Sequence, residues 1–418
     1  MSLKFIYLYL ILIYYTSYLI PNTLHLLLKM TITPASRMNL VQEYYFSTKL
    51  KQIAEMRNSG IDVLNLGIGS PDLPPSDDTI KALSIAAQNP KNHAYQSYVG
   101  IPALREAMAG FYQDAYGVEL NPVDEILPLI GSKEGVMHIS MAYLEAGDEV
   151  LVPNPGYPTY RAASLLTGAT VVDYELSEAN GWLPDLVTLA KKDLSKVKLM
   201  WVNYPHMPTG AKASKGFFEE LRDFALTHNI LIVNDNPYSF ILNDDPQSVL
   251  SVEGMKEVAL ELNSLSKSHN MAGWRMGMLV GKAAFINPVL RFKSNMDSGM
   301  FLPLQMAAVA ALQNDKSWFK ELNKTYRNRQ QKVFGMMEIL DCQYDKNQSG
   351  MFVWAKIPIK YATGYELSDE ILEKSAVFIT PGGIFGTAGD GYIRTSLCAE
   401  ISVFEEAILR IRETLRIC

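Results

Sequence analysis

The sequence has few cysteines and little excess charge of either sign. Its 418 residues include three cysteines, Cys342, Cys398 and Cys418, with no metal-ligand spacing. An odd, scattered set of cysteines excludes a disulfide framework and a zinc site. We therefore predict that the protein is located in the reducing cytoplasm. The net charge of -6 and the absence of a long Lys/Arg run make nucleic acid an unfavourable partner. No repeat, low-complexity tract or Pro-rich linker marks further modules.

One apolar run, Phe5–Leu28, interrupts this picture of an ordinary globular chain. It could be a membrane anchor or signal, a disordered or packed extension, or an over-extended reading frame whose translation begins at Met30 or Met38. Its polar interruptions and lack of a small-residue cleavage site favour the last interpretation, and membrane association is not expected. An intact-mass measurement on native protein would distinguish these alternatives. We predict residues 1–35 to be an extension outside the fold.

Short β-rich runs then alternate with longer amphipathic ones. Phe217–Leu226 is typical of the latter, because its apolar side chains share one helical face. Such alternation predicts an α/β fold with a mostly parallel sheet, and functional groups beyond its strand ends. The predicted strands are Glu149–Val152, Thr170–Leu176, Leu199–Asn203, Ile230–Asn234, Ala259–Leu262 and Met278–Val280.

After Ser298 the pattern changes to that of a smaller α+β domain. A long helical stretch, Leu302–Leu340, precedes strands and a closing helix for which Ser402 and Glu405 form a capping box. The predicted strands are Met351–Ile357, Ala376–Thr380 and Tyr392–Ser396. We therefore expect an N-terminal arm with part of the small domain at residues 36–68, a large domain at 69–298 and the rest of the small domain at 299–418.

A lysine, a serine and an arginine lie within twelve residues after one predicted strand. The pattern is Ser264-x-x-Lys267 followed by Gly-x-Arg275-x-Gly. Lysine forms Schiff bases with carbonyl cofactors, and serine and arginine both bind phosphate. The spacing resembles the cofactor-lysine signature of the class I/II aminotransferases, whose aspartate, alanine and LL-diaminopimelate subgroup is the most similar.

This resemblance covers residues 36–418 and implies a pyridoxal 5′-phosphate (PLP) enzyme of fold-type I. It implies a large domain with a mostly parallel seven-stranded sheet and a smaller α+β domain. Lys267 would hold PLP as a Schiff base and move the substrate's α-proton, passing an amino group from an L-amino acid to a 2-oxo acid by a ping-pong route. A PLP-dependent lyase or synthase of the same fold is the alternative, and dependence on an acceptor 2-oxo acid distinguishes the two.

Asp235-x-x-Tyr238 follows the hydrophobic run Ile230–Val233. In the family, the aspartate pairs with the pyridine nitrogen and the tyrosine donates to the phenolic oxygen. A carboxylate keeps that nitrogen protonated, and the protonated ring withdraws electrons from the substrate's α-carbon. The resemblance thus implies that Asp235 creates the electron sink and Tyr238 tunes it.

The segment Asn203–Gly210 resembles the family's Asn-Pro-Thr-Gly turn, with one departure. Met207 stands where the family usually has an asparagine that donates to the phenolic oxygen, and a thioether cannot donate. Tyr238 is left as the main donor, with His206 or Asn203 as candidate helpers. We also expect Asn203 to bind the cofactor.

Met207→Asn is accordingly expected to lower the pKa of the Lys267 Schiff base, because a restored donor stabilises the deprotonated form. A pH titration of the cofactor's visible absorbance in both proteins measures this. No downward shift would contradict the interpretation.

Gly131, Ser132 and Lys133 precede a helical pattern, and a helix start suits a phosphate. Two roles stay open for Lys133: a cofactor-facing or solvated charge, or a contact to the distal carboxylate of an acidic substrate.

The resemblance also implies that Tyr157 stacks on the pyridine ring. Tyr95 matches a tyrosine donated to the phosphate of a neighbouring subunit, which implies a homodimer.

Substrate binding requires a cation for the α-carboxylate. Arg394, in Gly391-Tyr-Ile-Arg-Thr-Ser, matches the family's C-terminal arginine, and its guanidinium fork suits bidentate binding. Gly69 matches a position whose backbone approaches that carboxylate, where a side chain would obstruct it.

Overall fold

The computed structural model describes Leu8, Leu10 and residues 32–41 and 45–415. The apolar run Phe5–Leu28 lies almost wholly outside these residues, so the alternatives for it stay open. Among the described residues no helix is long and apolar enough to cross a bilayer. Residues 1–40 and 41–418 form separate units; the first contains the short helix η1 (Ser36–Leu40), and the second contains all the elements below.

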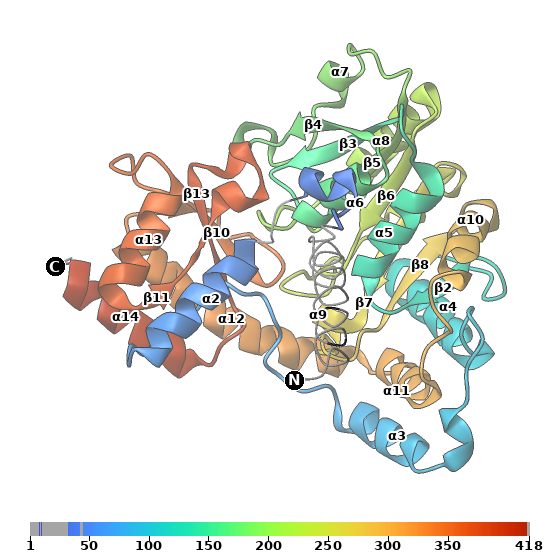
Figure 1. The fold of residues 1–418 in the computed structure, drawn as a ribbon, viewed down its shortest axis with the longest axis horizontal. Coiled ribbons are helices and arrows are strands. Elements are labelled where there is room, and N and C mark those ends of the chain that lie inside the picture. Colours follow the sequence, from blue (N-terminus) through green and yellow to red (C-terminus); the bar gives the residue numbers. More distant parts are fainter. Residues whose placement is uncertain (1–7, 9, 11–31, 42–44, 416–418) are drawn as a thin grey trace. The chain divides into compact units, whose positions relative to one another are not determined.

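The larger sheet has seven strands in the order β2-β8-β7-β6-β5-β3-β4 (Figure 1). β8 runs antiparallel to both of its neighbours, and the other pairs are parallel. The strands are β2 (Ile126–Leu129), β3 (Glu149–Asn154), β4 (Thr170–Glu175), β5 (Val197–Val202), β6 (Leu231–Asp235), β7 (Ala259–Ser264) and β8 (Gly277–Gly281).

The strands predicted from Glu149 onward are confirmed in place and type. β2 was not predicted from the sequence, because it has only four residues and contains Pro128. It lies at the sheet edge, where a missing N–H is tolerated.

Alternating strand residues pack on opposite faces of this sheet. Leu199 and Trp201 of β5 join the core under one helical layer, and Met200 and Val202 join the core under the other. One layer comprises α5 (Ser132–Tyr143), α6 (Pro158–Leu166) and α10 (Ala283–Ser294); the other comprises α4 (Pro102–Tyr116), α8 (Lys215–His228) and α11 (Leu302–Leu312). The helix predicted at Phe217–Leu226 is thus confirmed within α8.

Short elements connect these layers. They are α3 (Asp77–Ala87), α7 (Leu186–Leu189), α9 (Leu265–Ser268), η2 (Pro90–His93), η3 (Glu178–Asn180), η4 (Val249–Ser251) and η5 (Met255–Glu257).

A smaller antiparallel sheet, β12-β13-β10-β9, has its own core with three long helices. The elements are α12 (Lys316–Ile339), β9 (Gln343–Tyr344), β10 (Phe352–Lys356), α13 (Gly364–Ser375), β12 (Thr380–Pro381), η6 (Gly382–Phe385), η7 (Thr387–Gly389), β13 (Tyr392–Ser396) and α14 (Ile401–Leu415).

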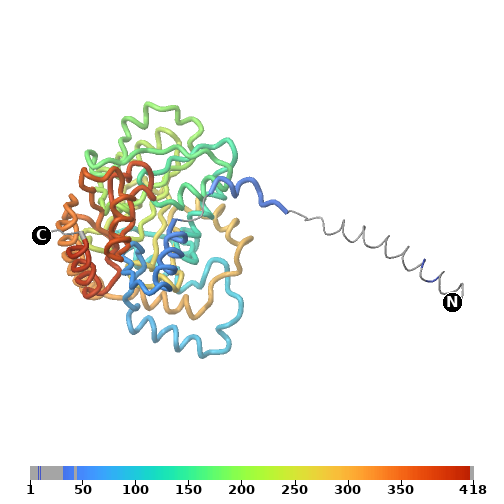
Figure 2. Tube along the Cα trace, turned by 60° about the vertical axis from the view of Figure 1, so that its left-hand side comes forward, coloured from blue at the N-terminus to red at the C-terminus, as the bar shows by residue number. Residues whose placement is uncertain are grey.

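The N-terminal part of this unit packs against its C-terminal part. β1 (Leu64–Asn65) pairs in parallel with β11 (Val377–Phe378). On α2 (Tyr45–Asn58), Ile53 joins a cluster with Phe378, and Lys49 pairs with Asp369 of α13 at 2.7 Å. Figure 2 shows the blue α2 against the red C-terminal segment. The expected domain boundaries stay a prediction.

Three sequence-based expectations for this region differ from the structure. The stretch Leu302–Leu340 is two helices, α11 and α12, separated by residues 313–315. Asp315 caps the start of α12 by accepting from the Ser317 N–H at 2.8 Å. The run Ala376–Thr380 is divided between β11 and β12, which belong to different sheets. The capping box was wrong, because α14 begins at Ile401 and Ser402 lies in its first turn.

A buried ion pair joins α12 to the segment that follows β1. Arg329 donates from both terminal nitrogens to the two carboxylate oxygens of Asp72, each at 2.7 Å, and also to the Leu397 carbonyl at 3.1 Å. The Arg329 side chain is 4% exposed, against 27% for Asp72. The carboxylate of Asp72 therefore compensates the cost of burying the charge of this guanidinium.

Asp72→Ala is expected to lower the free energy of unfolding by about 3–5 kcal/mol, because it leaves this buried guanidinium without a counter-charge. Asp244→Ala is the matched control. Asp244 pairs with Arg327 at 2.6 Å, but the two side chains are 81% and 51% exposed, so its loss should cost at most about 1 kcal/mol. Urea unfolding of both variants measures the difference; equal losses would contradict a special role for the buried pair.

Candidate active site

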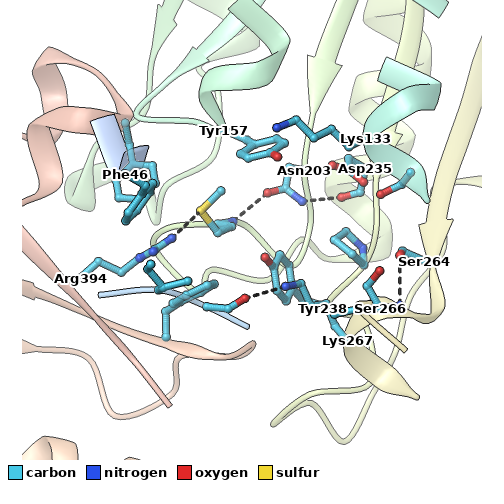
Figure 3. A pocket seen from close by; sticks show the side chains of 18 of the residues that line it. Phe46, Lys133, Tyr157, Asn203, Asp235, Tyr238, Ser264, Ser266, Lys267 and Arg394 are labelled. Atoms are coloured by element: carbon cyan, nitrogen blue, oxygen red, sulfur yellow. Dashed lines mark hydrogen bonds between the residues drawn. The ribbon is translucent and has the colours of Figure 1, made fainter. Parts of the chain in front are cut away.

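The carboxyl ends of three neighbouring strands open onto a cavity of about 430 Å³ (Figure 3). Asn203 follows β5, Asp235 ends β6 and Ser264 ends β7. Parallel strands bring such residues to one edge of a sheet. The lining residues are Phe46, Ser47, Leu50, Ile68, Gly69, Ser132, Lys133, Tyr157, Tyr160, Asn203, Met207, Asp235, Pro237, Tyr238, Ser264, Ser266, Lys267, Ala272, Arg275, Phe352, Phe385 and Arg394.

Asp235 brings a buried carboxylate to the cavity. Its Oδ2 accepts from the Tyr160 hydroxyl at 2.7 Å, and its Oδ1 has no hydrogen-bond partner among the described residues. Burial raises the pKa of Asp235 to about 6, and the nearby Glu261 adds to that rise. A cation or N–H donor in the cavity would therefore be strongly attracted to this oxygen.

Glu261 is a second buried carboxylate, on the neighbouring strand β7. It accepts from the Tyr112 hydroxyl at 2.9 Å, the Ser248 hydroxyl at 2.8 Å, the Asn234 amide at 2.9 Å and the Val249 N–H at 3.0 Å. Four donors satisfy it without any contribution from the cavity. Its effect on the site is electrostatic, through the pKa of Asp235.

Lys267 lies on the single-turn helix α9, directly after β7. Ser264 caps this turn by accepting from the Ser266 N–H at 3.1 Å, which fixes the direction in which Lys267 points. Its Nζ donates to the Gly69 carbonyl at 2.8 Å, and burial lowers its pKa. A buried amine with a lowered pKa is a better nucleophile than a solvated lysine.

The start of α5 and Arg275 form a cradle for an anion. Gly131 precedes the helix with φ of +78°, and a Cβ at this position would collide with the Arg275 guanidinium. A Cβ on Gly277 would lie 2.7 Å from the Ser132 nitrogen. The first N–H groups of a helix have no acceptor within it, so together with a guanidinium they suit a phosphate. Lys133 extends from the same turn to the vicinity of Tyr157 (Figure 3).

The turn after β5 carries Asn203 and Met207. The Asn203 side chain accepts from the Met207 N–H at 2.8 Å and donates to the Asp235 carbonyl, so both of its ends hold backbone. His206, outside the lining, contacts the Thr209 hydroxyl at 2.8 Å, and burial lowers its pKa to about 3. Tyr238 does face the cavity, and burial raises its pKa, which keeps the phenol protonated as a donor.

Arg394, on β13, lies on the opposite side of the cavity. Its guanidinium lies 3.9 Å from the Phe352 ring centre and 4.7 Å from that of Phe385. It donates to the Gly67 carbonyl at 2.7 Å and to the Met207 sulfur at 3.4 Å. These contacts hold a buried cation at a position where it can meet an anionic substrate.

Comparisons with known proteins agree with this geometry. Residues 61–411 match the family model for aminotransferase class I and II. The chain belongs to the class I and II aminotransferases. LL-diaminopimelate aminotransferases from Dehalococcoides mccartyi and Moorella thermoacetica are 42% and 41% identical, covering 90% and 91% of this chain and 97% and 98% of those proteins. The apo structure of BacF from Bacillus subtilis superposes with a TM-score of 0.88 at 38% identity, covering 92% of this chain and 98% of that one.

The family and the fold-type I architecture predicted from the sequence are therefore confirmed. The chain is thus a transaminase, and its family is PLP-dependent. Twelve of the predicted site residues come together: eleven line the cavity, and Gly131 precedes the lining residue Ser132 and packs against Arg275. Tyr95 does not join them; its side chain is 91% exposed.

Several lining residues of the aminotransferase were missed in the sequence. Tyr160 and Ser266 lie within motifs that were recognised, three residues after Tyr157 and one before Lys267, so their spacing offered a signal. Phe46, Leu50 and Phe385 offered none, because an apolar residue in a helix or loop looks the same whether it faces a core or a cavity.

Proposed function

We propose that this aminotransferase passes an amino group from an L-amino acid to a 2-oxo acid by a ping-pong reaction, with PLP covalently attached to Lys267. The observation that carries the proposal is the pair of Lys267 and Asp235, an amine of lowered pKa and a buried carboxylate whose Oδ1 has no partner among the described residues, facing one cavity. The residues fit this cofactor at three places: an amine for its aldehyde, a carboxylate for its ring nitrogen and a cradle for its phosphate.

The phosphate would be held by the backbone of Gly131, Ser132 and Lys133 with Ser264 and Arg275. Tyr157, which lines the cavity, would cover the cofactor ring, and Tyr238 would donate to the phenolic oxygen. Asn203 would act through the turn that it holds. When bound, PLP supplies an electron-withdrawing ring that stabilises negative charge at the substrate's α-carbon.

The protein's own contribution begins with the substrate. Arg394 would bind the α-carboxylate, and the absence of a side chain at Gly69 leaves room for it; a Cβ there would collide with Phe352. That contact would orient the Cα–H bond toward Lys267, whose Nζ would take the proton from Cα.

We further propose a cytoplasmic homodimer. Tyr95 is exposed beside other exposed apolar side chains, including Tyr98 and Phe301, and the backbone of Gln96 packs tightly on Gly299. An apolar patch of this kind is typical of an interface, and Tyr95 would reach the phosphate of the partner subunit. Analytical ultracentrifugation of the purified protein measures the oligomeric state.

The decisive experiment is reductive trapping. Purified protein with added PLP is reduced with borohydride and digested, and the label is expected on the peptide that contains Lys267. The same preparation should form a 2-oxo acid catalytically only when an acceptor 2-oxo acid is present. Label on another peptide would refute the attachment site, and turnover without an acceptor would favour the lyase or synthase alternative.

A further inference from the structure

The cavity has two chemically different sides. The charged residues Lys133, Asp235, Lys267 and Arg275 come from the strand ends and helix starts of the large sheet. The facing side comes from α2, the segment after β1, β10 and η6. We call it the apolar wall, and its residues are Phe46, Leu50, Ile68, Phe352 and Phe385.

Arg394 is the cation that lies within the apolar wall among the lining residues. Its guanidinium lies 5.6 Å from the Phe46 ring centre, in addition to its closer contacts with Phe352 and Phe385. If Arg394 takes the α-carboxylate, a donor's side chain extends from Cα along these rings. Ser47, which lines the cavity beside Phe46, is polar but uncharged.

Met207 continues this apolar surface across the cavity. Its sulfur lies 3.4 Å from Arg394 Nη1. A thioether is polarisable and packs well against aromatic groups. The guanidinium is thus surrounded by apolar groups on several sides.

We propose that the apolar wall selects amino donors with an apolar side chain, aromatic ones foremost, over donors whose side chain carries a second carboxylate or an ammonium group. The inference rests on the proposed function and names its substrate class. An apolar side chain gains from leaving water for this wall, whereas a charged side chain would be desolvated there without a counter-charge. LL-diaminopimelate, whose far end carries both charges, is disfavoured on the same ground.

Lys133 is the lining cation that could oppose this selection. It extends from the start of α5 to the vicinity of Tyr157 (Figure 3). Its location next to the anion cradle places it with the cofactor in our proposal. A strong preference for dicarboxylic donors would assign it to the substrate instead.

Single-turnover reactions of the PLP-loaded enzyme test the proposal. Loss of the cofactor's aldehyde absorbance is followed with L-phenylalanine, L-leucine and L-methionine and with L-glutamate, L-aspartate and LL-diaminopimelate. L-methionine and L-glutamate form a size-matched pair. The rate constant per unit concentration is expected to be at least tenfold higher for the apolar donors. Equal or faster reaction of a charged donor overturns the inference and leaves the aminotransferase proposal standing, whereas no reaction with any of the six donors overturns the inference alone, since the proposed function is decided by trapping at Lys267.

A matched pair of variants tests the wall directly. Leu50 lines the cavity from α2 and is 44% exposed, so a longer side chain can be accommodated there. Leu50→Arg supplies a cation to the wall and should raise the glutamate-to-methionine ratio at least tenfold. Leu50→Met keeps the wall apolar and should keep methionine ahead. The inference fails if Leu50→Arg leaves the ratio where Leu50→Met has it.

Discussion

Replacing Lys267 by alanine is expected to lower kcat/KM for transamination by about 10⁴-fold or more, because both the covalent attachment and the proton-transferring base are lost. Lys267→Arg should be equally inactive, since it keeps the positive charge but cannot form the same bond with an aldehyde. Steady-state assays with an excess of PLP and both substrates measure the loss.

Lys282→Ala is the control for this experiment. Lys282 is an exposed lysine paired with Glu257, remote from the cavity lining, and its loss should change kcat/KM by less than about twofold. Activity of Lys267→Ala within about tenfold of wild type would remove the basis for the proposed mechanism.

Asp235→Asn is expected to have opposite effects on activity and stability. Activity should fall by about 10²-fold or more, since a neutral amide cannot keep a ring nitrogen protonated. The cofactor-free protein, however, should gain about 2–3 kcal/mol of unfolding free energy at pH 7, because folding raises the pKa of this carboxyl from 3.8 to about 6 and the ionised form is penalised. Asparagine has no such penalty.

The pH dependence of that gain follows from the direction of the shift. A carboxyl whose pKa is raised by folding destabilises the protein only where it ionises. The stability difference between Asp235→Asn and wild type should therefore be absent below about pH 4, grow between pH 4 and 6 and stay constant above. Urea unfolding of both cofactor-free proteins across this range measures it; a difference that shrinks with rising pH would contradict the assignment.

The site residues that the sequence predicted best are those that belong to short sequence motifs. Lys267, Asp235 and Arg394 belong to local motifs, each within or directly after a strand whose apolar pattern is visible, so their positions could be predicted. The cradle was also predictable, because Val136, Ile139 and Tyr143 recur at helical spacing directly after it and so mark a helix start there.

Other features depend on contacts between distant parts of the chain. Phe46 meets Arg394 only because α2 packs on the C-terminal elements, and no local pattern encodes that approach. Glu261 alternates with apolar neighbours in β7, as a half-exposed strand residue would, and only its four donors show that it is buried. The helix break at Asp315 was missed because helix-forming sequence lies on both sides of it, an apolar helix before the break and an amphipathic one after it.

The pairing of β1 with β11 has a consequence during protein synthesis. Leu64 and Val377 are partners separated by 313 positions, so at about 5–20 residues per second the first strand waits roughly 15–60 s on the ribosome for the second. The large sheet, whose strands lie between residues 126 and 281, is complete well before that. A nascent chain would therefore present the lysine and aspartate of the cavity before it acquires the arginine at 394, and it could engage a cofactor earlier than a substrate.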